Sequence, residues 1–263
     1  MQLDGRTALV TGATGGIGEA IARALATRGA NLMLTGRQTE VLGRLARELS
    51  AQVFAVDLAD RRALDLLIER SAEVDVLVAN AALPASGRID TFAPDEIDAA
   101  LDVNLRAPIL LARSLAARMA TRRMGHLVFI NSLSGKVAAP GAALYSATKF
   151  GLRGFAQCLR QDLHGTGVGV STVFPGFIRD AGMFAKSGVT LPRGVGTRSP
   201  AEVAFAVVRA IEHDVAEVDV APVGLRVGAL MAGVAPTVSG TVQRWLGAGQ
   251  IAEEIARGQR RKV

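Results

Sequence analysis

The chain is poor in the residues that several specialised protein classes depend on. Its one cysteine, Cys158, excludes a disulfide framework and a cysteine-based zinc site. The three histidines, His126, His164 and His213, are far apart, so we predict no metal site and expect them to occupy surface or helix-terminal positions. Cys158 lies among apolar residues of an expected helix, where we predict a buried thiol.

Long apolar runs are absent as well. No stretch reaches 18 apolar residues, and residues 1–6 lack the charged and apolar regions of a signal peptide. We therefore expect a cytoplasmic protein with no membrane span. Of the 263 residues, 49% are hydrophobic and 21% charged, which excludes a disordered chain and suits one domain of 1–263.

Charge of one sign dominates, but it is scattered. The net charge is +6, and only four of the 30 basic residues are lysines. The arginines form no stripe and no nucleic-acid-binding motif, so we predict no nucleic-acid partner. A positive field does favour an anionic cofactor.

Short apolar segments alternate with amphipathic ones along most of the chain. The expected strands are 7–11, 31–35, 53–56, 74–80, 127–130, 168–174 and 218–220. The expected helices are 17–25, 41–49, 64–68, 94–119, 145–163 and 200–211. This alternation predicts an α/β fold: a Rossmann-type, doubly wound parallel sheet of about seven strands, with helices on both faces.

The first strand runs directly into a glycine cluster that opens a helix. Gly12 would allow a tight turn, Gly16 would let the backbone approach a pyrophosphate, and Gly18 would let the helix pack on the strand. The exposed N–H groups and dipole of the helix N-terminus then suit phosphate. A glycine cluster in this strand–turn–helix context predicts dinucleotide binding.

The spacing Gly-x-x-x-Gly-x-Gly resembles the short-chain dehydrogenase/reductase superfamily. Four further elements match in order: Asp57 after the third strand, Asn80-Ala81-Ala82 after the fourth, Ser132 with the Tyr145-x-x-x-Lys149 pair, and Pro175-Gly176 after the sixth. The likeness covers about residues 5–221. It implies cofactor contacts from the glycine loop, the ends of later strands and the catalytic helix: Gly12, Thr14, Gly15, Gly16, Ile17, Gly18, Arg37, Asp57, Leu58, Asn80, Ala81, Tyr145, Lys149, Pro175, Gly176 and Ile178.

Tyr145 and Lys149 are four residues apart, so they share one helix face. A nearby ammonium favours phenolate, and we therefore expect the pKa of Tyr145 to lie below its usual value near 10, which suits a general acid/base. Ser132 would hold the substrate oxygen. The resemblance assigns Asn104 to a proton relay, in which it would fix a water between Lys149 and solvent.

The second expected strand ends Thr35-Gly36-Arg37, with no acid to bind a ribose 2′-hydroxyl. Arg37 could instead pair with the 2′-phosphate of NADP. We predict NADP as the cofactor, with NAD left open.

Residues 178–198 hold four glycines and no clear period, and we expect them to form a lid over the substrate. Asp180 stands where the family often has threonine. An apolar substrate pocket is predicted from five side chains: Leu133, Val137, Phe177, Met183 and Phe184.

The C-terminal arm, about 222–263, departs most from the family. Residues 227–243 carry no charge but are broken by Pro236, so a helical arm should pack on the body, the lid or a second subunit, with peripheral membrane contact as an alternative. Trp245 would be a packing anchor.

We predict a homodimer or homotetramer built through the faces of the two helices that contain Asn104 and Lys149, because apolar residues follow both: Leu110, Leu111, Leu115, Met119, Leu152, Phe155 and Leu159.

Together these patterns predict an NAD(P)-dependent oxidoreductase that interconverts an alcohol and a ketone or aldehyde, acting on a fairly apolar small molecule. The alternative is a catalytically silent, dinucleotide-sensing regulatory protein on the same fold. Intact Ser132, Tyr145 and Lys149 favour the enzyme, because a sensor does not need them.

Overall fold

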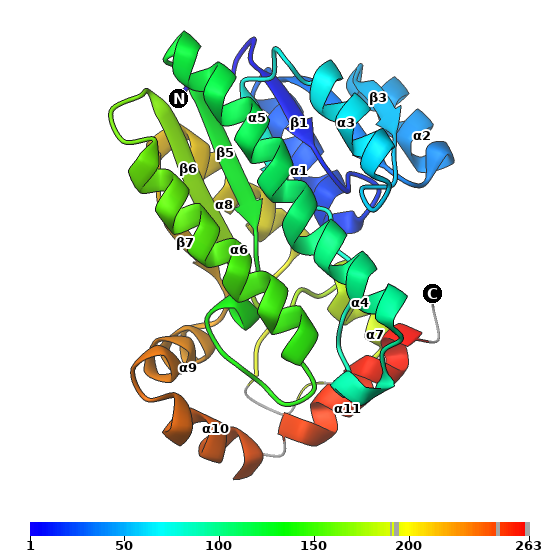
Figure 1. The fold of residues 1–263 in the computed structure, drawn as a ribbon, viewed down its shortest axis with the longest axis vertical. Coiled ribbons are helices and arrows are strands. Elements are labelled where there is room, and N and C mark those ends of the chain that lie inside the picture. Colours follow the sequence, from blue (N-terminus) through cyan, green and yellow to red (C-terminus); the bar gives the residue numbers. More distant parts are fainter. Residues whose placement is uncertain (190, 192–194, 246–247, 261–263) are drawn as a thin grey trace.

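Seven parallel strands form one sheet at the centre of the molecule (Figure 1). The computed structural model describes residues 1–189, 191, 195–245 and 248–260. The sheet order is β3-β2-β1-β4-β5-β6-β7, so the winding direction reverses between β1 and β4. The strand bounds are β1 Thr7–Val10, β2 Asn31–Gly36, β3 Gln52–Ala55, β4 Val76–Ala79, β5 Gly125–Ile130, β6 Val168–Pro175 and β7 Glu217–Val220. The predicted Rossmann-type fold is confirmed.

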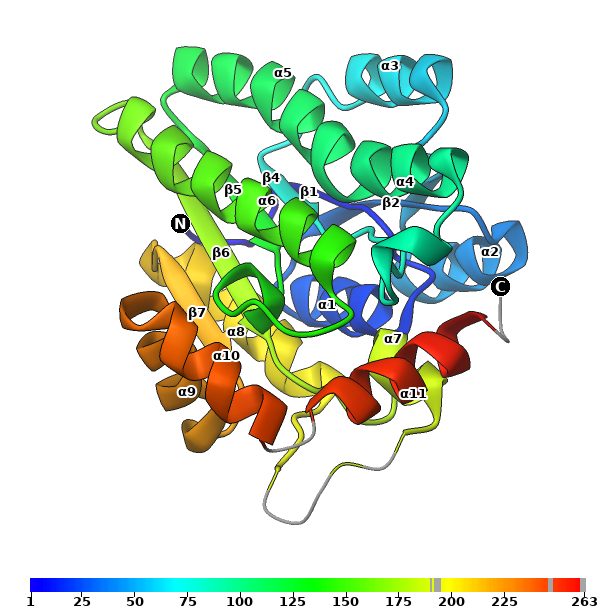
Figure 2. The ribbon, with the colours of Figure 1, turned by 60° about the horizontal axis from the view of Figure 1, so that its bottom comes forward.

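Helices cover both faces of the sheet (Figure 2). One face carries α1 (Gly16–Thr27), α2 (Thr39–Leu49) and α8 (Pro200–His213), whose apolar sides join one core cluster. The other face carries α3 (Arg61–Arg70), α5 (Ala107–Arg122) and α6 (Ala143–Asp162), which join a second cluster. Because both faces are covered, every residue of β4 and β5 is buried, which explains why His126 is the one polar side chain in these two strands.

The helix predicted for 94–119 is one continuous helical segment in space. It consists of α4 (Pro94–Leu101), a π-helical turn (Asp102–Arg106) and α5. The π turn contains Asn104 and interrupts the regular hydrogen-bond ladder at that point. Such turns often mark functional positions in helices.

Three C-terminal helices lie beyond the carboxyl ends of the strands (Figures 1 and 2). They are α9 (Val223–Val234), α10 (Pro236–Trp245) and α11 (Ala248–Arg260). α11 packs on α7 (Gly182–Ser187), the short helix of the lid segment. Trp245 is 86% exposed, so the prediction that it anchors the packing is wrong.

The predicted apolar faces of α5 and α6 are mostly buried inside the subunit. Leu111, Leu115, Met119 and Leu152 are fully buried in the second core cluster. They pack against the subunit's own sheet, so their burial does not require the second subunit that was predicted to cover them. Homo-oligomerisation stays a prediction, without that reason.

Two further side-chain expectations are also wrong. Cys158 is exposed, because it lies on the outer side of α6. His126 is buried on β5, where its Nε2 lies 2.8 Å from the Ser171 hydroxyl on β6. Burial lowers the pKa of His126 to about 4.

This buried histidine makes stability pH-dependent. The folded protein disfavours the imidazolium, so the contribution is full above pH 6.5 and is lost as the pH falls toward 4. We expect the free energy of unfolding to drop by about 2.5 kcal/mol between pH 7 and pH 4.5 from this group. Urea unfolding of the wild type and of His126→Gln at both pH values measures this drop. The free energy of unfolding of the variant should fall by about 2.5 kcal/mol less than that of the wild type over this range.

The matched control is His164→Gln, because His164 is exposed at the end of α6. It should retain the wild-type pH dependence. Identical pH slopes for the wild type and His126→Gln would contradict the assignment.

Candidate active site

A cleft of about 1030 Å³ opens at the carboxyl ends of the strands, where the sheet order reverses. This is the place where doubly wound sheets bind their ligands. The cleft brings together every predicted cofactor, substrate-pocket and catalytic residue except Asn104. Residues as far apart in sequence as Gly12 and Phe184 thus meet in one site.

The glycine loop is shaped by close contacts that a side chain would break. Gly12 has a φ of +64°, and a Cβ there would lie 2.8 Å from the Cα of Ala81. A Cβ on Gly18 would collide with the carbonyl oxygen of Gly12. A Cβ on Gly16 would lie 2.5 Å from the Cβ of Ala181, so the lid segment closes on this part of the loop.

Thr11 and Asn80 hold the two halves of the sheet together at the cleft floor. The Thr11 hydroxyl accepts from the N–H groups of Asn80 and Ala81 at 3.0 and 3.1 Å. The Asn80 amide donates to the carbonyls of Thr11 and Gly12 at 3.0 and 3.1 Å. The sequence predicted a cofactor contact for Asn80 but did not single out Thr11. The one feature that could have indicated Thr11 is its position at the end of the first strand.

A cationic side chain, Arg37, lies at the β2 end of the cleft. Arg37 is largely exposed, and its guanidinium lies 3.9 Å from the carboxylate of Asp57. Arg37, Asp57 and Lys149 are the charged residues among the described cleft lining. No side chain caps the N-terminus of α1, so its first N–H groups are left for a ligand. A glycine cradle, an open helix N-terminus and Arg37 fit an anionic dinucleotide.

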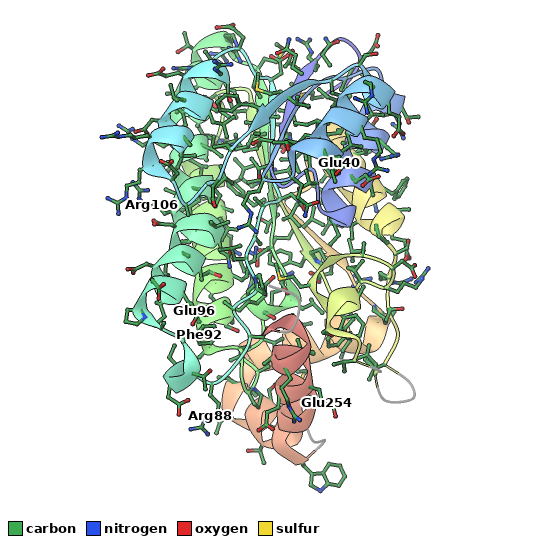
Figure 3. The ribbon with its side chains drawn as sticks, turned by 90° about the vertical axis from the view of Figure 1, so that its right-hand side faces the viewer. Glu40, Arg88, Phe92, Glu96, Arg106 and Glu254 are labelled. Atoms are coloured by element: carbon green, nitrogen blue, oxygen red, sulfur yellow. The ribbon has the colours of Figure 1, made fainter. Side chains whose placement is uncertain are left out.

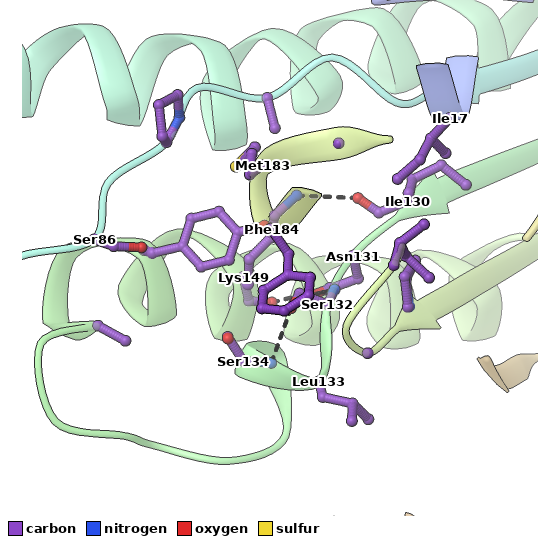
Figure 4. Close-up of a pocket in the computed structure, with 18 of the residues that line it drawn as sticks. Ile17, Ser86, Ile130, Asn131, Ser132, Leu133, Ser134, Lys149, Met183 and Phe184 are labelled. Atoms are coloured by element: carbon purple, nitrogen blue, oxygen red, sulfur yellow. Dashed lines mark hydrogen bonds between the residues drawn. The ribbon is translucent and has the colours of Figure 1, made fainter. Parts of the chain in front are cut away.

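Ser132, Tyr145 and Lys149 line the same cleft as the glycine loop, and Figure 4 shows Ser132 close to Lys149. Ser132 follows β5 directly, and its hydroxyl accepts from the N–H of Ser134 at 3.1 Å and hydrogen-bonds Tyr145. Lys149 is buried; its Nζ donates to the Ile130 carbonyl at 3.0 Å and lies 5.7 Å from the centre of the Tyr145 ring.

Asn131 is a positioning residue that sequence reasoning missed. It is buried between β5 and α6, and its amide donates to the carbonyl of Lys149 at 3.0 Å. Its oxygen accepts from the N–H of Ser132 at 2.8 Å. The Asn131 side chain therefore fixes the position of Ser132, at the end of β5, relative to Lys149 on α6. The only signal was a polar residue next to Ser132 at the end of an apolar strand.

The protonation of the pair differs from the sequence expectation. Burial raises the pKa of Tyr145 to about 12, although the hydrogen bond with Ser132 opposes the rise. Burial also lowers the pKa of Lys149 to about 8. The prediction of a lowered Tyr145 pKa is therefore wrong, because desolvation of the phenol outweighs its hydrogen bond with Ser132. At neutral pH Tyr145 holds its proton and can donate it.

Asn104 lies beside the cleft and does not line it. It is buried, its oxygen accepts from the N–H of Leu83 at 2.6 Å, and its amide donates to the Leu83 carbonyl at 3.0 Å. Both polar groups thus hold the chain that leaves β4. The proton-relay water stays a prediction.

The lid segment begins and ends at a β-bridge between Ile178 and Arg198. Between them lies α7, and the Phe177 and Phe184 rings pack with their centres 4.9 Å apart. Met183 and Phe184 line the cleft near Ser132 (Figure 4). Asp180 has a φ of +66° and pairs with its neighbour Arg179 at 3.5 Å. Residues 190 and 192–194 of the expected lid lie outside the described structure.

The chain is similar in sequence to known dehydrogenases and reductases. The short chain dehydrogenase family matches residues 6–190. Ketoacyl reductase HetN of Nostoc sp. is 34% identical over 259 residues, which cover 93% of this chain and 90% of that protein. The 3-oxoacyl-[acyl-carrier-protein] reductase FabG of Rickettsia conorii is 34% identical and covers 68% of this chain and 75% of its own.

A solved structure supports the same family. A metagenomic short-chain oxidoreductase in complex with NADP is similar with a TM-score of 0.70 at 33% identity, covering 84% of this chain and 97% of its own. The chain belongs to the short-chain dehydrogenase/reductase family. It is an NAD(P)-binding oxidoreductase of that type, as the sequence resemblance implies.

No three His, Cys, Asp or Glu side chains among the described residues are grouped so that they could hold a metal ion. No described helix has both the length and the apolar character needed to cross a membrane.

Removing the Tyr145 hydroxyl should stop turnover. In Tyr145→Phe the ring still packs but the transferable proton is gone, so we expect the rate to fall by about 10²–10⁴-fold or more. Cofactor affinity should stay within a few-fold, measured by titrating the variant with NADPH and following fluorescence. A variant that keeps a tenth of the wild-type rate would show that Tyr145 is not the acid.

Carbonyl reduction should depend on the protonation of Lys149. We expect kcat/KM to be flat near pH 6–7 and to fall above pH about 8, as the ammonium loses its proton while Tyr145 keeps its own. Alcohol oxidation needs the tyrosine without its proton and should rise over the same range. Initial rates in both directions from pH 6 to 10 test this, and a reduction rate still rising at pH 10 would contradict it.

Proposed function

We propose that the protein is an NADP(H)-dependent reductase of ketones or aldehydes, working in both directions with the corresponding alcohol. The observation that carries the proposal is the convergence of Ser132, Tyr145 and Lys149 in the same cleft as the glycine loop and Arg37. Two similar proteins are named as ketoacyl reductases, which supports a ketone as the reacting group.

The chain's own residues would orient and protonate the substrate. A bound nicotinamide supplies the hydride, which adds with its electron pair to the carbonyl carbon. The Ser132 and Tyr145 hydroxyls would hold the carbonyl oxygen, and the Tyr145 proton would pass to that oxygen as the carbon–oxygen π bond breaks. The product is the alcohol, and the tyrosine then regains a proton. Lys149 would stabilise the transient phenolate, because an ammonium close to the ring favours that charge.

NADPH oxidation with a panel of simple ketones and aldehydes tests the proposal directly. Reduction of any member, lost in Tyr145→Phe, is the expected outcome. Tight NADPH binding without turnover of any carbonyl would favour the dinucleotide-sensing alternative.

Arg37 should set the choice of NADP over NAD. β2 ends in Thr35-Gly36 and is followed by Arg37 rather than by an acidic residue, and a charge-assisted phosphate contact is worth about 1.5–3 kcal/mol. We expect Arg37→Ala to raise KM for NADPH by about tenfold or more and to leave KM for NADH nearly unchanged. Steady-state kinetics with both cofactors measures it.

The matched control is Gln38→Ala, which changes a neutral residue of the same cleft wall. The substitution Gly36→Asp would place an acid at the end of β2, but a Cβ there would lie 2.8 Å from the Thr14 hydroxyl. Its effect on cofactor choice would therefore be mixed with a distortion of the glycine loop, and Arg37→Ala is the cleaner test. Equal use of NADPH and NADH by the unmodified protein would contradict the role of Arg37.

A further inference from the structure

The cleft does not end at the predicted substrate pocket. It continues past Phe184 to the C-terminal helices, where its lining includes Leu225, Gly228, Ala229 and Val238 of α9 and α10 and Ala252 and Ile255 of α11. The predicted pocket residues ended at Phe184, so these helices add a wall that sequence reasoning did not assign to the site. This extension opens from the side of the cleft that holds Ser132 and Tyr145.

α11 spans the cleft between two segments that flank the catalytic residues. On one side it packs on α7, where a Cβ on Gly258 would collide with the backbone of Ser187. On the other side Ala252 lies next to Gly141, in the loop just before α6. Figure 2 shows α11 beside α7, and Figure 3 shows Glu254 of α11 at the same end of the molecule as Arg88. The arm is therefore built onto the rim of the active site.

The extension is uncharged. The charged residues of the described cleft lining, Arg37, Asp57 and Lys149, all belong to the cofactor end or the catalytic group. Beyond Tyr145 the lining is aliphatic, aromatic, glycine or hydroxyl-bearing. A carboxylate or phosphate lying against this lining would meet no charged partner to offset the hydration that it gives up there.

Two glycines of α9 leave the extension open. Gly224 and Gly228 are one turn apart, both line the cleft, and a Cβ built on either meets no atom within 4 Å. Met231 and Val238, which are more than half exposed, line the same space. An apolar ligand lying there would cover these side chains, and burial of apolar surface would favour its binding.

We infer that α9, α10 and α11 form a subsite for a neutral, unbranched apolar chain attached to the reacting ketone, with Gly224 and Gly228 setting the space for that chain. The inference rests on the proposed ketone reduction and adds the substrate class: a long-chain aliphatic ketone without a terminal charge.

The test compares ketones of increasing length: butan-2-one, octan-2-one and dodecan-2-one, with 11-oxododecanoate as the charged analogue. Each buried methylene is worth about fourfold in binding, so kcat/KM should rise by at least about tenfold from the four-carbon to the twelve-carbon ketone. The terminal carboxylate should lower kcat/KM by about tenfold or more relative to dodecan-2-one.

The variants Gly224→Leu and Gly228→Leu should fold, since their side chains would enter open space. Both should reduce butan-2-one within about twofold of the wild type and reduce dodecan-2-one at least about tenfold less efficiently. Gly233→Leu is the matched control: a Cβ there also meets nothing within 4 Å, but Gly233 does not line the cleft. It should change neither rate.

A binding measurement separates this inference from the proposed function. Calorimetric titration of dodecan-2-one into the protein with NADP⁺, which carries no transferable hydride, reports chain binding alone. Reduction of butan-2-one with no gain from a longer chain, or Gly224→Leu and Gly228→Leu variants that match the wild type on dodecan-2-one, would overturn the subsite and leave the proposed function standing. Dodecan-2-one binding that Gly228→Leu weakens, with no ketone turned over, would support the subsite and overturn the proposed function. Neither binding nor turnover would overturn both.

Discussion

The site depends on how the sheet is closed between β1 and β4. The winding reverses there, so the two halves of the chain meet at one seam with no helix between the strand ends. Thr11 and Asn80 bind each other's backbone across that seam and fix the turn at Gly12. The glycine loop, the helix N-terminus behind it and the start of the chain leaving β4 all take their positions from these bonds.

Burial then decides the chemistry. Among the described residues no carboxylate pairs with Lys149, whose ammonium donates to the Ile130 carbonyl, while Tyr145 is desolvated and hydrogen-bonded to Ser132. The same desolvation moves the two pKa values apart, the lysine down and the tyrosine up. The result is a neutral phenol held beside an amine that titrates near physiological pH, an arrangement suited to delivering a proton to a substrate oxygen. Asn131 keeps the strand and the helix that carry these groups in register.

The C-terminal helices give the molecule two kinds of apolar surface. One side, with Gly228 and Ala229, faces the cleft. The other side exposes Val223, Leu230 and Trp245 without contributing to the described cleft lining. The family match ends at residue 190, before these helices begin, so a part of the chain outside that match walls the far end of the site.

Much of the fold was determined by the sequence alone. Apolar strands alternating with amphipathic helices are local signals, and each strand flanked by turns was found within a few residues of its observed bounds. The catalytic residues could also be identified from local sequence. Tyr145 and Lys149 are four residues apart, so they share a helix face however the helix packs, and Ser132 follows directly after an apolar segment that was recognisable as a strand.

What only the tertiary structure decided are the properties that depend on surroundings. The burial of His126, the exposure of Cys158 and Trp245, and the raised pKa of Tyr145 follow from which elements pack against each residue, and periodicity does not reveal that. The sequence also could not show that the oxygen and the nitrogen of the Asn104 side chain both hydrogen-bond the backbone of Leu83. Nor could it show that α11 contacts both α7 and Gly141 across the cleft. Those contacts join segments far apart in the chain, and their geometry exists only once the sheet has brought its ends together.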